Sequence, residues 1–168
     1  MAQGFLSRID FGSGIARPLM NFWPPFRGAG IRVTYIAPDW REVRVELRQR
    51  LLNRNYVGTH FGGSIFAMTD PFHMLMMMRN LGRDFIVWDK AGSVRFLKPG
   101  RGTLAARFEL TQAMVDEAVA ATASGARHEP TFAVDITNAA GEVVARVDKT
   151  LHIRRVDAAV AAVAARAA

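Results

Sequence analysis

Residues 55–82 read NYVGTHFGGSIFAMTDPFHMLMMMRNLG, and this stretch decides the fold. A polar, glycine-rich turn opens into a long segment that is apolar in almost every helical direction. A helix that is apolar all round must be buried on all sides, either in a membrane or by a surrounding sheet. Asp70 and His73 interrupt the segment well short of the roughly 20 residues that a membrane span needs. The stretch therefore predicts a soluble protein built around a buried central helix.

The length and composition of the chain favour one domain in a reducing compartment. A chain of 168 residues without a low-complexity linker predicts a single domain over 1–168. The absence of cysteine excludes disulfides, thiolate metal ligands and cysteine nucleophiles. The first residues, MAQGFLSRIDFGSG, lack the basic region and unbroken apolar run of a signal peptide. We therefore expect a cytoplasmic protein with no membrane partner.

The net charge of +7 raises the question of a nucleic-acid partner. The arginines are scattered, and over residues 41–50 they alternate with Val43, Val45 and Leu47, which is typical of a strand with one solvated face. No helix-turn-helix, zinc-finger or RNA-binding aromatic signature stands out. We expect a solvated arginine face and no nucleic-acid partner, although the same charge would attract a polyphosphate ligand.

Period-two alternation and turn residues predict six strands. The first two, over 30–37 and 40–51, are joined by Pro38-Asp39, a hairpin signal. The other four are expected over residues 84–97, 102–110, 129–137 and 142–154. A short helix is expected at about 15–23, before Pro24 and Pro25, and another over 111–124 with Gly125 as its C-cap. The Ala-rich tail over about 156–168 is a helix or a frayed end without an assigned function.

The expected order is two strands, the central helix, and four more strands with one inserted helix. Strands that follow one another, instead of alternating regularly with helices, indicate an antiparallel sheet and the α+β class. The arrangement that fits this order is a curled antiparallel β-sheet wrapped round a long central helix.

This order, together with the turn and the helix start, resembles the hotdog fold, and more narrowly the acyl-CoA thioesterases of the phenylacetate-degradation type. Those enzymes carry an Asn, a Gly three residues later, a His-Gly-Gly at the helix start, and an acidic residue seven positions after the last Gly. Asn55, Gly58, Gly62, Gly63 and Asp70 keep that spacing. The strand SVRFLKP at 93–99 also resembles the family, and the likeness covers roughly residues 32–154. It is greatest to an uncharacterised bacterial branch known as a domain of unknown function.

One position departs from the family pattern. The family's histidine falls on Phe61, and the nearest imidazole, His60, stands one place earlier. A shift of one residue on a strand or turn can point a side chain to the opposite face. The resemblance implies catalytic roles for Asp70, Gly62, Gly63, Asn55 and His60, of which His60 depends on this shift.

Thioester hydrolysis explains why these residue types suit such a site. The backbone N–H groups of Gly62 and Gly63, at a helix start, lack partners within the helix and are natural donors to a developing oxyanion. Asp70 lies about two helical turns from Gly63, near the same helix face. A carboxylate in an apolar segment suits a general base.

Substrate contacts are expected from a wider set. Arg79, Arg83, Lys98 and Arg101 lie near the far helix end and the following strand turn, where cations can meet the phosphates of coenzyme A. The complete set of expected substrate-binding residues is Gly58, Phe61, Phe66, His73, Arg79, Arg83, Lys98 and Arg101. No His, Asp or Glu spacing indicates a metal site, and coenzyme A is expected only as part of the substrate.

Several structural alternatives stay open. Asp70 followed by Pro71 also fits the N-cap and first residue of a new helix, or Pro71 kinks one continuous helix. The glycines could serve turn geometry alone. The methionines of 74–78 are core filler or a soft wall for acyl chains. His73 either orients Asp70 or is a hydrogen-bonded core or interface histidine.

Two functions from different classes fit these observations. The first is an acyl-CoA or acyl thioester hydrolase, and the second is a non-catalytic hotdog module that binds an acyl or other apolar ligand. Asn55, the glycine pair and Asp70 favour the first, whereas Phe61 favours the second. Because a curled sheet leaves edge strands that must be covered, we also expect a homodimer or a dimer of dimers.

Overall fold

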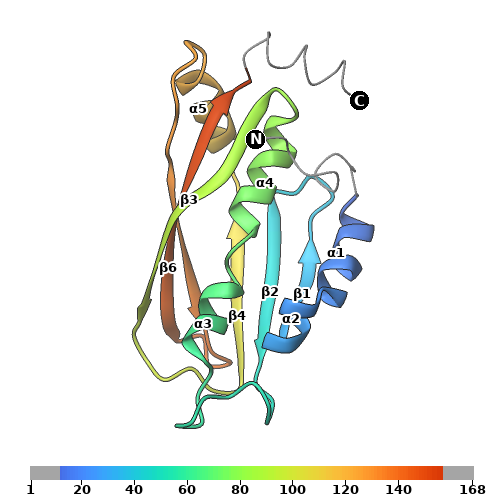
Figure 1. Ribbon diagram of the computed structural model, residues 1–168, viewed down its shortest axis with the longest axis vertical. Helices are drawn as coiled ribbons and strands as arrows, with labels where there is room; N and C mark the ends of the chain where they lie inside the picture. Colours follow the sequence, from blue (N-terminus) through green and yellow to red (C-terminus); the bar gives the residue numbers. More distant parts are fainter. Residues whose placement is uncertain (1–11, 157–168) are drawn as a thin grey trace.

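The computed structural model describes residues 12–156 of the chain. Six strands form one antiparallel sheet in the order β1-β2-β4-β5-β6-β3. The strands are β1 (Ile31–Ile36), β2 (Glu42–Arg48), β3 (Phe85–Phe96), β4 (Thr103–Glu109), β5 (Thr131–Thr137) and β6 (Val143–Arg155). The helices are α1 (Ser13–Phe22), α2 (Pro24–Ala29), α3 (Gly62–Ala67), α4 (Phe72–Leu81) and α5 (Gln112–Ala121). The sheet curls round α3 and α4, while α1 and α2 lie beside β1 (Figure 1).

The predicted α+β arrangement and its order of strands are confirmed, whereas the helix α2, which begins at Pro24, was not predicted. The second strand is shorter than expected and ends at Arg48, since the Asn53 side chain donates hydrogen bonds to the carbonyls of Arg48 and Ala29, both at 2.8 Å. Gly30 faces the same Asn53 side chain with φ +83°, a left-handed conformation that favours glycine. Most of the Ala-rich tail, 157–168, lies outside the described residues, as does the segment 1–11.

The central helix is divided into two. Residues 68–71 form a turn between α3 and α4, in which Thr69 Oγ1 donates a 2.7 Å hydrogen bond to the carbonyl of Phe66. Pro71, which has no N–H, is the N-cap of α4, and no side chain caps that helix. Both structural alternatives for this position are therefore wrong: Asp70 is not the N-cap, and no single kinked helix passes through Pro71.

Burial of the central helices is one-sided. The buried residues of α4 face the sheet: Phe72, His73, Met76, Met77 and Leu81. The half-buried ones lie on its other flank: Met74, Leu75 and Met78. The expectation of burial on all sides is wrong for one chain, because a single curled sheet covers only the side of the helix that faces it.

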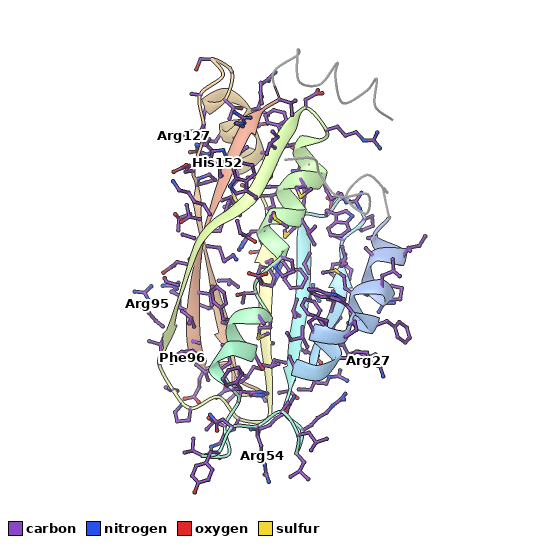
Figure 2. The ribbon with its side chains drawn as sticks, in the orientation of Figure 1. Arg27, Arg54, Arg95, Phe96, Arg127 and His152 are labelled. Carbon is purple, nitrogen blue, oxygen red and sulfur yellow. The ribbon has the colours of Figure 1, made fainter. Side chains whose placement is uncertain are left out.

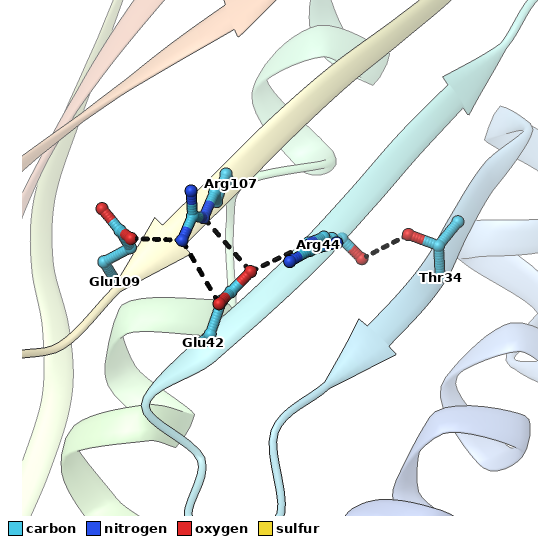
Figure 3. A network of polar contacts seen from close by, with 5 residues as sticks. All are labelled: Thr34, Glu42, Arg44, Arg107 and Glu109. Atoms are coloured by element: carbon cyan, nitrogen blue, oxygen red, sulfur yellow. Dashed lines mark hydrogen bonds and ion pairs between the residues drawn. The ribbon is translucent and has the colours of Figure 1, made fainter.

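The face of the sheet turned away from α3 and α4 carries the arginines. In β2, Val43, Val45 and Leu47 are fully buried, so Arg44 points the other way into solvent. Glu42 pairs there with Arg44 at 2.5 Å and with Arg107 at 3.1 Å (Figure 3). The hydrogen bond from Arg44 is the main reason that the pKa of Glu42 is lowered. The predicted strand with one solvated arginine face is confirmed.

The two edges of the sheet differ. At the β1 edge, the Asn21 side chain of α1 accepts from the N–H of Val33 at 2.8 Å and donates to its carbonyl at 2.9 Å. This side chain occupies backbone groups that another strand would otherwise use. At the β3 edge, the Arg95 side chain points away from the sheet (Figure 2), and the Phe96 side chain is largely exposed although its ring lies against Gly62. In one chain, therefore, the edge at β1 is partly covered by α1, while β3 presents exposed side chains at the opposite edge.

Candidate active site

Three charged side chains from distant parts of the chain meet on the inner face of the sheet. The ammonium Nζ of Lys149 lies 2.8 Å from Oδ1 of Asp70 and 3.3 Å from Oδ1 of Asp89. We call these three residues the Lys149 cluster. The Lys149 side chain is only 4% exposed, whereas that of Asp70 is 54% exposed. The cluster thus connects the interior of the sheet to a carboxylate that water can reach.

The sheet and the helix break bring the cluster together. Val147, Lys149 and Leu151 alternate inward along β6, and the turn after α3 places Asp70 above them. Asp89 stands at an irregularity in the pairing of β3 with β6, after which Gly92 pairs with Lys149. Neither Lys149 nor Asp89 was predicted as a site residue from the sequence. The usable signal was a lysine at an inward, otherwise apolar position of a strand.

Phe66 and Gly92 complete the surroundings of Lys149. The Lys149 ammonium lies 5.3 Å from the centroid of the Phe66 ring, within range of a cation–π interaction. A Cβ at Gly92 would lie 2.8 Å from the Phe66 ring and 3.1 Å from Cδ of Lys149. Gly92 therefore provides the room in which the ring and the lysine stem pack together.

The cluster perturbs the ionisation of its neighbours. Burial raises the pKa of Asp89, while the charge of Lys149 opposes that change and the charge of Asp70 adds to it. Burial, followed by the charge of Lys149, lowers the pKa of His73 to about 4. A single buried ammonium thus affects groups on β3 and on α4.

His73 is a core residue. Its ring stacks on Phe132 at 4.8 Å and meets Phe108 edge-on at 5.2 Å. Its Nδ1 atom is buried and has no hydrogen-bond partner among the described residues. The core interpretation is therefore supported, but without the hydrogen bond that we expected.

This environment predicts a pH dependence of stability. The pKa of His73 is lowered from its ordinary value of 6.5 to about 4 in the folded protein. Between pH 6.5 and pH 4, the unfolded chain therefore binds this proton more tightly than the folded protein does. The stabilisation is fully present above pH 6.5 and is lost as the pH falls towards 4. We expect acidification from pH 7 to 4.5 to cost about 2–3 kcal/mol through this residue.

The measurement is the free energy of unfolding of wild type and His73→Phe at both pH values. Phenylalanine keeps a ring against Phe132 but does not titrate. On acidification, the variant should lose about 2–3 kcal/mol less stability than the wild type. The contribution of the carboxylates is common to both proteins and cancels in this difference. An equal loss in both proteins would contradict this role of His73.

The polar groups of Asn55 and His60 are used to build the turn before α3. The Asn55 side chain accepts from the N–H of Thr59 at 2.9 Å and donates to Oγ1 of Thr59 at 2.8 Å. His60 is buried, and its Nε2 donates to the carbonyl of Gly102 at 2.8 Å. Burial lowers the pKa of His60, and that hydrogen bond opposes the change. Gly58 has φ +76°, which the turn requires. The geometry supports structural roles for all three.

Gly62 and Gly63 form the start of α3 under two aromatic rings. A Cβ at Gly62 would lie 2.9 Å from Cζ of Phe96, and one at Gly63 would collide with the ring of Phe61. Neither glycine has a positive φ, so turn geometry alone does not explain them. Within residues 12–156, neither N–H donates to a backbone carbonyl. Phe61 itself is 60% exposed.

The four expected phosphate-binding cations do not form one group within a chain. Arg79 packs over the Trp40 ring at 5.1 Å, near the end of α4 and close in sequence to Arg83. Lys98 pairs with Glu142 at 2.6 Å, and Arg101 Nη1 donates to the carbonyl of Gly58 at 3.1 Å. The first pair precedes β3 and the second follows it, so the length of that strand separates them (Figure 1).

Residues 12–156 contain no cluster of His, Cys, Asp or Glu that could hold a metal ion. No helix in this range is long and apolar enough to cross a membrane.

Comparison with protein families gives one match over most of the chain. Residues 13–153 match the model of a domain of unknown function, DUF4442. No curated protein matches the chain.

Solved structures show the same fold at low sequence identity. A Pseudomonas aeruginosa protein of unknown function, named as a probable thioesterase, is 19% identical, with TM-score 0.77 over 88% of this chain and 99% of that chain. The thioesterase HI1161 of Haemophilus influenzae is 14% identical, with TM-score 0.63 over 88% and 94%. The E. coli PaaI protein, from the phenylacetic acid degradation operon, is 16% identical, with TM-score 0.57 over 84% and 91%. The predicted hotdog fold and the likeness to the phenylacetate-degradation type are confirmed.

Proposed function

Since the chain belongs to the DUF4442 family and has the hotdog fold, we propose that it hydrolyses acyl thioesters, acyl-CoA in particular. The observation that carries this proposal is the Asp70 carboxylate at the break between α3 and α4. It is half-exposed, it is held from inside by Lys149 at 2.8 Å, and it stands at the acidic position of the thioesterase motif. The thioesterases of the same fold support the choice of reaction class.

In the proposed reaction, Asp70 acts as a general base on water. The Asp70 carboxylate takes a proton from a water molecule whose oxygen attacks the thioester carbonyl carbon. The N–H groups of Gly62 and Gly63 donate to the oxyanion that forms. The C–S bond then breaks, the thiolate leaves with the proton held by Asp70, and the acyl group leaves as a carboxylic acid.

Arg101 and Lys98 are the cations that we assign to the phosphates of coenzyme A. Arg101 is bound to the carbonyl of Gly58, in the turn that leads to Gly62 and Gly63. Its guanidinium therefore lies at the turn that precedes the proposed oxyanion donors, and a guanidinium suits bidentate contact with phosphate. Arg79 and Arg83 lie beyond the other end of β3, and in this proposal they reach the ligand only if a second subunit brings them to it.

The proposed active form is a homodimer joined through β3. Phe96 and Leu97 are more than half-exposed at that edge of the sheet, and the half-buried flank of α4 also lacks a cover within one chain. An open strand edge of this kind is normally paired or covered. Pairing β3 with its copy would cover both features and place the Lys149 cluster close to the subunit boundary.

The variant Phe96→Lys tests this interface. A charge at an exposed edge position opposes strand pairing, so we expect dimeric wild type and a shift of the variant towards monomer. The matched control is Ile15→Lys. Ile15 is similarly exposed, and it belongs to α1, which lies at the opposite edge of the sheet beside β1 (Figure 1). Multi-angle light scattering at micromolar concentration gives the masses. A monomeric wild type would contradict the dimer, and an unaffected variant would place the interface elsewhere.

The experiment that tests the activity is a hydrolysis assay with short, long and aromatic acyl-CoAs. We expect thiol release with at least one class of acyl chain. The alternative function is a non-catalytic acyl-binding module, favoured by Phe61 at the position of the family's histidine. Binding of an acyl-CoA without thiol release across the panel would support that alternative.

A further inference from the structure

Lys149 is a buried charge that the reaction described above does not use. Only 3% of the residue is exposed, and it stands among apolar inward residues of β6. Taking an ammonium out of water is costly unless close partners of opposite charge compensate it. Asp70 at 2.8 Å and Asp89 at 3.3 Å provide that compensation. Replacing a whole buried ion cluster by apolar residues often costs a protein little stability, so the presence of this one needs an explanation.

The geometry of the cluster is directional. Lys149 approaches Asp70 from the interior of the sheet and contacts its Oδ1 atom. Among the described residues, Oδ2 of Asp70 accepts no hydrogen bond, and the side chain is half-exposed. One carboxylate oxygen is thus anchored, while the other remains available to water. Asp89 holds the ammonium from the side of β3, and Gly92 leaves space for its stem.

We propose that Lys149 is a positioning residue, whose ammonium holds the Asp70 carboxylate in its orientation, with Asp89 as the second carboxylate that fixes the ammonium in place. This inference rests on the proposed thioesterase function. Lys149 touches no reacting atom; it acts through Asp70. The charged and titratable groups that face it are Asp70 from the turn, Asp89 from β3 and His73 from α4.

Removal of the ammonium has a predictable effect on these groups. Without it, the Oδ1 atom of Asp70 loses its anchor, and Asp89 is left without its partner of opposite charge. The pKa of Asp89 should rise further, because Lys149 opposes the rise caused by burial. The pKa of His73 should rise from about 4, because Lys149 contributes to lowering it.

Lys149→Met tests the proposal, since methionine keeps an unbranched stem without the charge. We expect kcat to fall about tenfold or more, with KM within about twofold, because a general base held out of its productive geometry slows proton transfer without weakening substrate binding. The control is Lys90→Met, which removes an exposed lysine paired with Glu129 and should leave kcat unchanged.

The Asp89→Asn background covers a failure of Lys149→Met to fold, because it removes the carboxylate that the lost ammonium would leave without an opposite charge. In that background, Lys149→Met should again lower kcat about tenfold or more, with KM within about twofold. An unchanged kcat in both backgrounds would overturn the proposal.

Titration of His73 by NMR provides a readout that needs no substrate. In Lys149→Met, its imidazole should titrate at higher pH than in the wild type, and Lys90→Met should not change it. An unmoved His73 titration would overturn the electrostatic role of Lys149, whatever the enzyme does. Failure of the wild type to hydrolyse any acyl-CoA would instead overturn the proposed function. The two failures are therefore distinguishable.

Discussion

Asp70→Asn should abolish thioester hydrolysis while leaving the protein folded. Asparagine keeps the shape of the side chain but cannot take a proton from water. Loss of a general base typically costs on the order of 10²–10⁴-fold in rate. Since Asp70 does not cap α4, and Asp89 still pairs with the buried Lys149, we expect the variant to remain folded. The measurements are kcat with the best acyl-CoA of the panel and the melting temperature.

Asp135→Asn is the matched control for this experiment. Asp135 also pairs with a cation, Arg146 at 2.8 Å, but on a partly exposed part of the sheet outside the Lys149 cluster. Its substitution should leave turnover unchanged. Near-wild-type turnover of Asp70→Asn with unchanged melting would remove Asp70 from the reaction and leave the binding-module function.

Phe72→Ala should lower the free energy of unfolding by about 3–5 kcal/mol, the usual cost of removing a fully buried phenylalanine ring. Phe72 is 0% exposed and begins α4 directly after Pro71. Its ring lies 4.9 Å from that of Phe108 on β4 and 6.1 Å from that of Phe26 on α2. One side chain therefore joins the central helix to the sheet and to the N-terminal helices.

Denaturant unfolding measures this loss. The control is Phe22→Ala, because Phe22 is 70% exposed on α1 and its removal leaves no cavity. We expect the control to change stability by about 0.5 kcal/mol or less. A loss below about 1 kcal/mol for Phe72→Ala would show that the core collapses into the vacated space.

The sequence by itself determined the six strands, their order and the inserted helix α5. Alternation in β2 predicted the buried Val43 and Val45 and the solvated Arg44, because side chains of a strand point alternately to its two faces. The helical spacing before Gly125 predicted α5, whose N-cap Thr111 accepts from the N–H of Met114. These features follow from the spacing of residues that are close in the chain, so local sequence patterns are enough to predict them.

Only the tertiary structure decided the composition of the site. The break at residues 68–71, with Pro71 and not Asp70 as the N-cap of α4, was not among the arrangements expected from Asp70-Pro71. Asp70 and Lys149 are 79 residues apart, and their contact requires β6 to be paired with β3 and covered by α3 and α4. A lysine in a strand has no preferred partner until strand register and helix placement fix its surroundings. The buried ion cluster therefore became visible only in the folded chain.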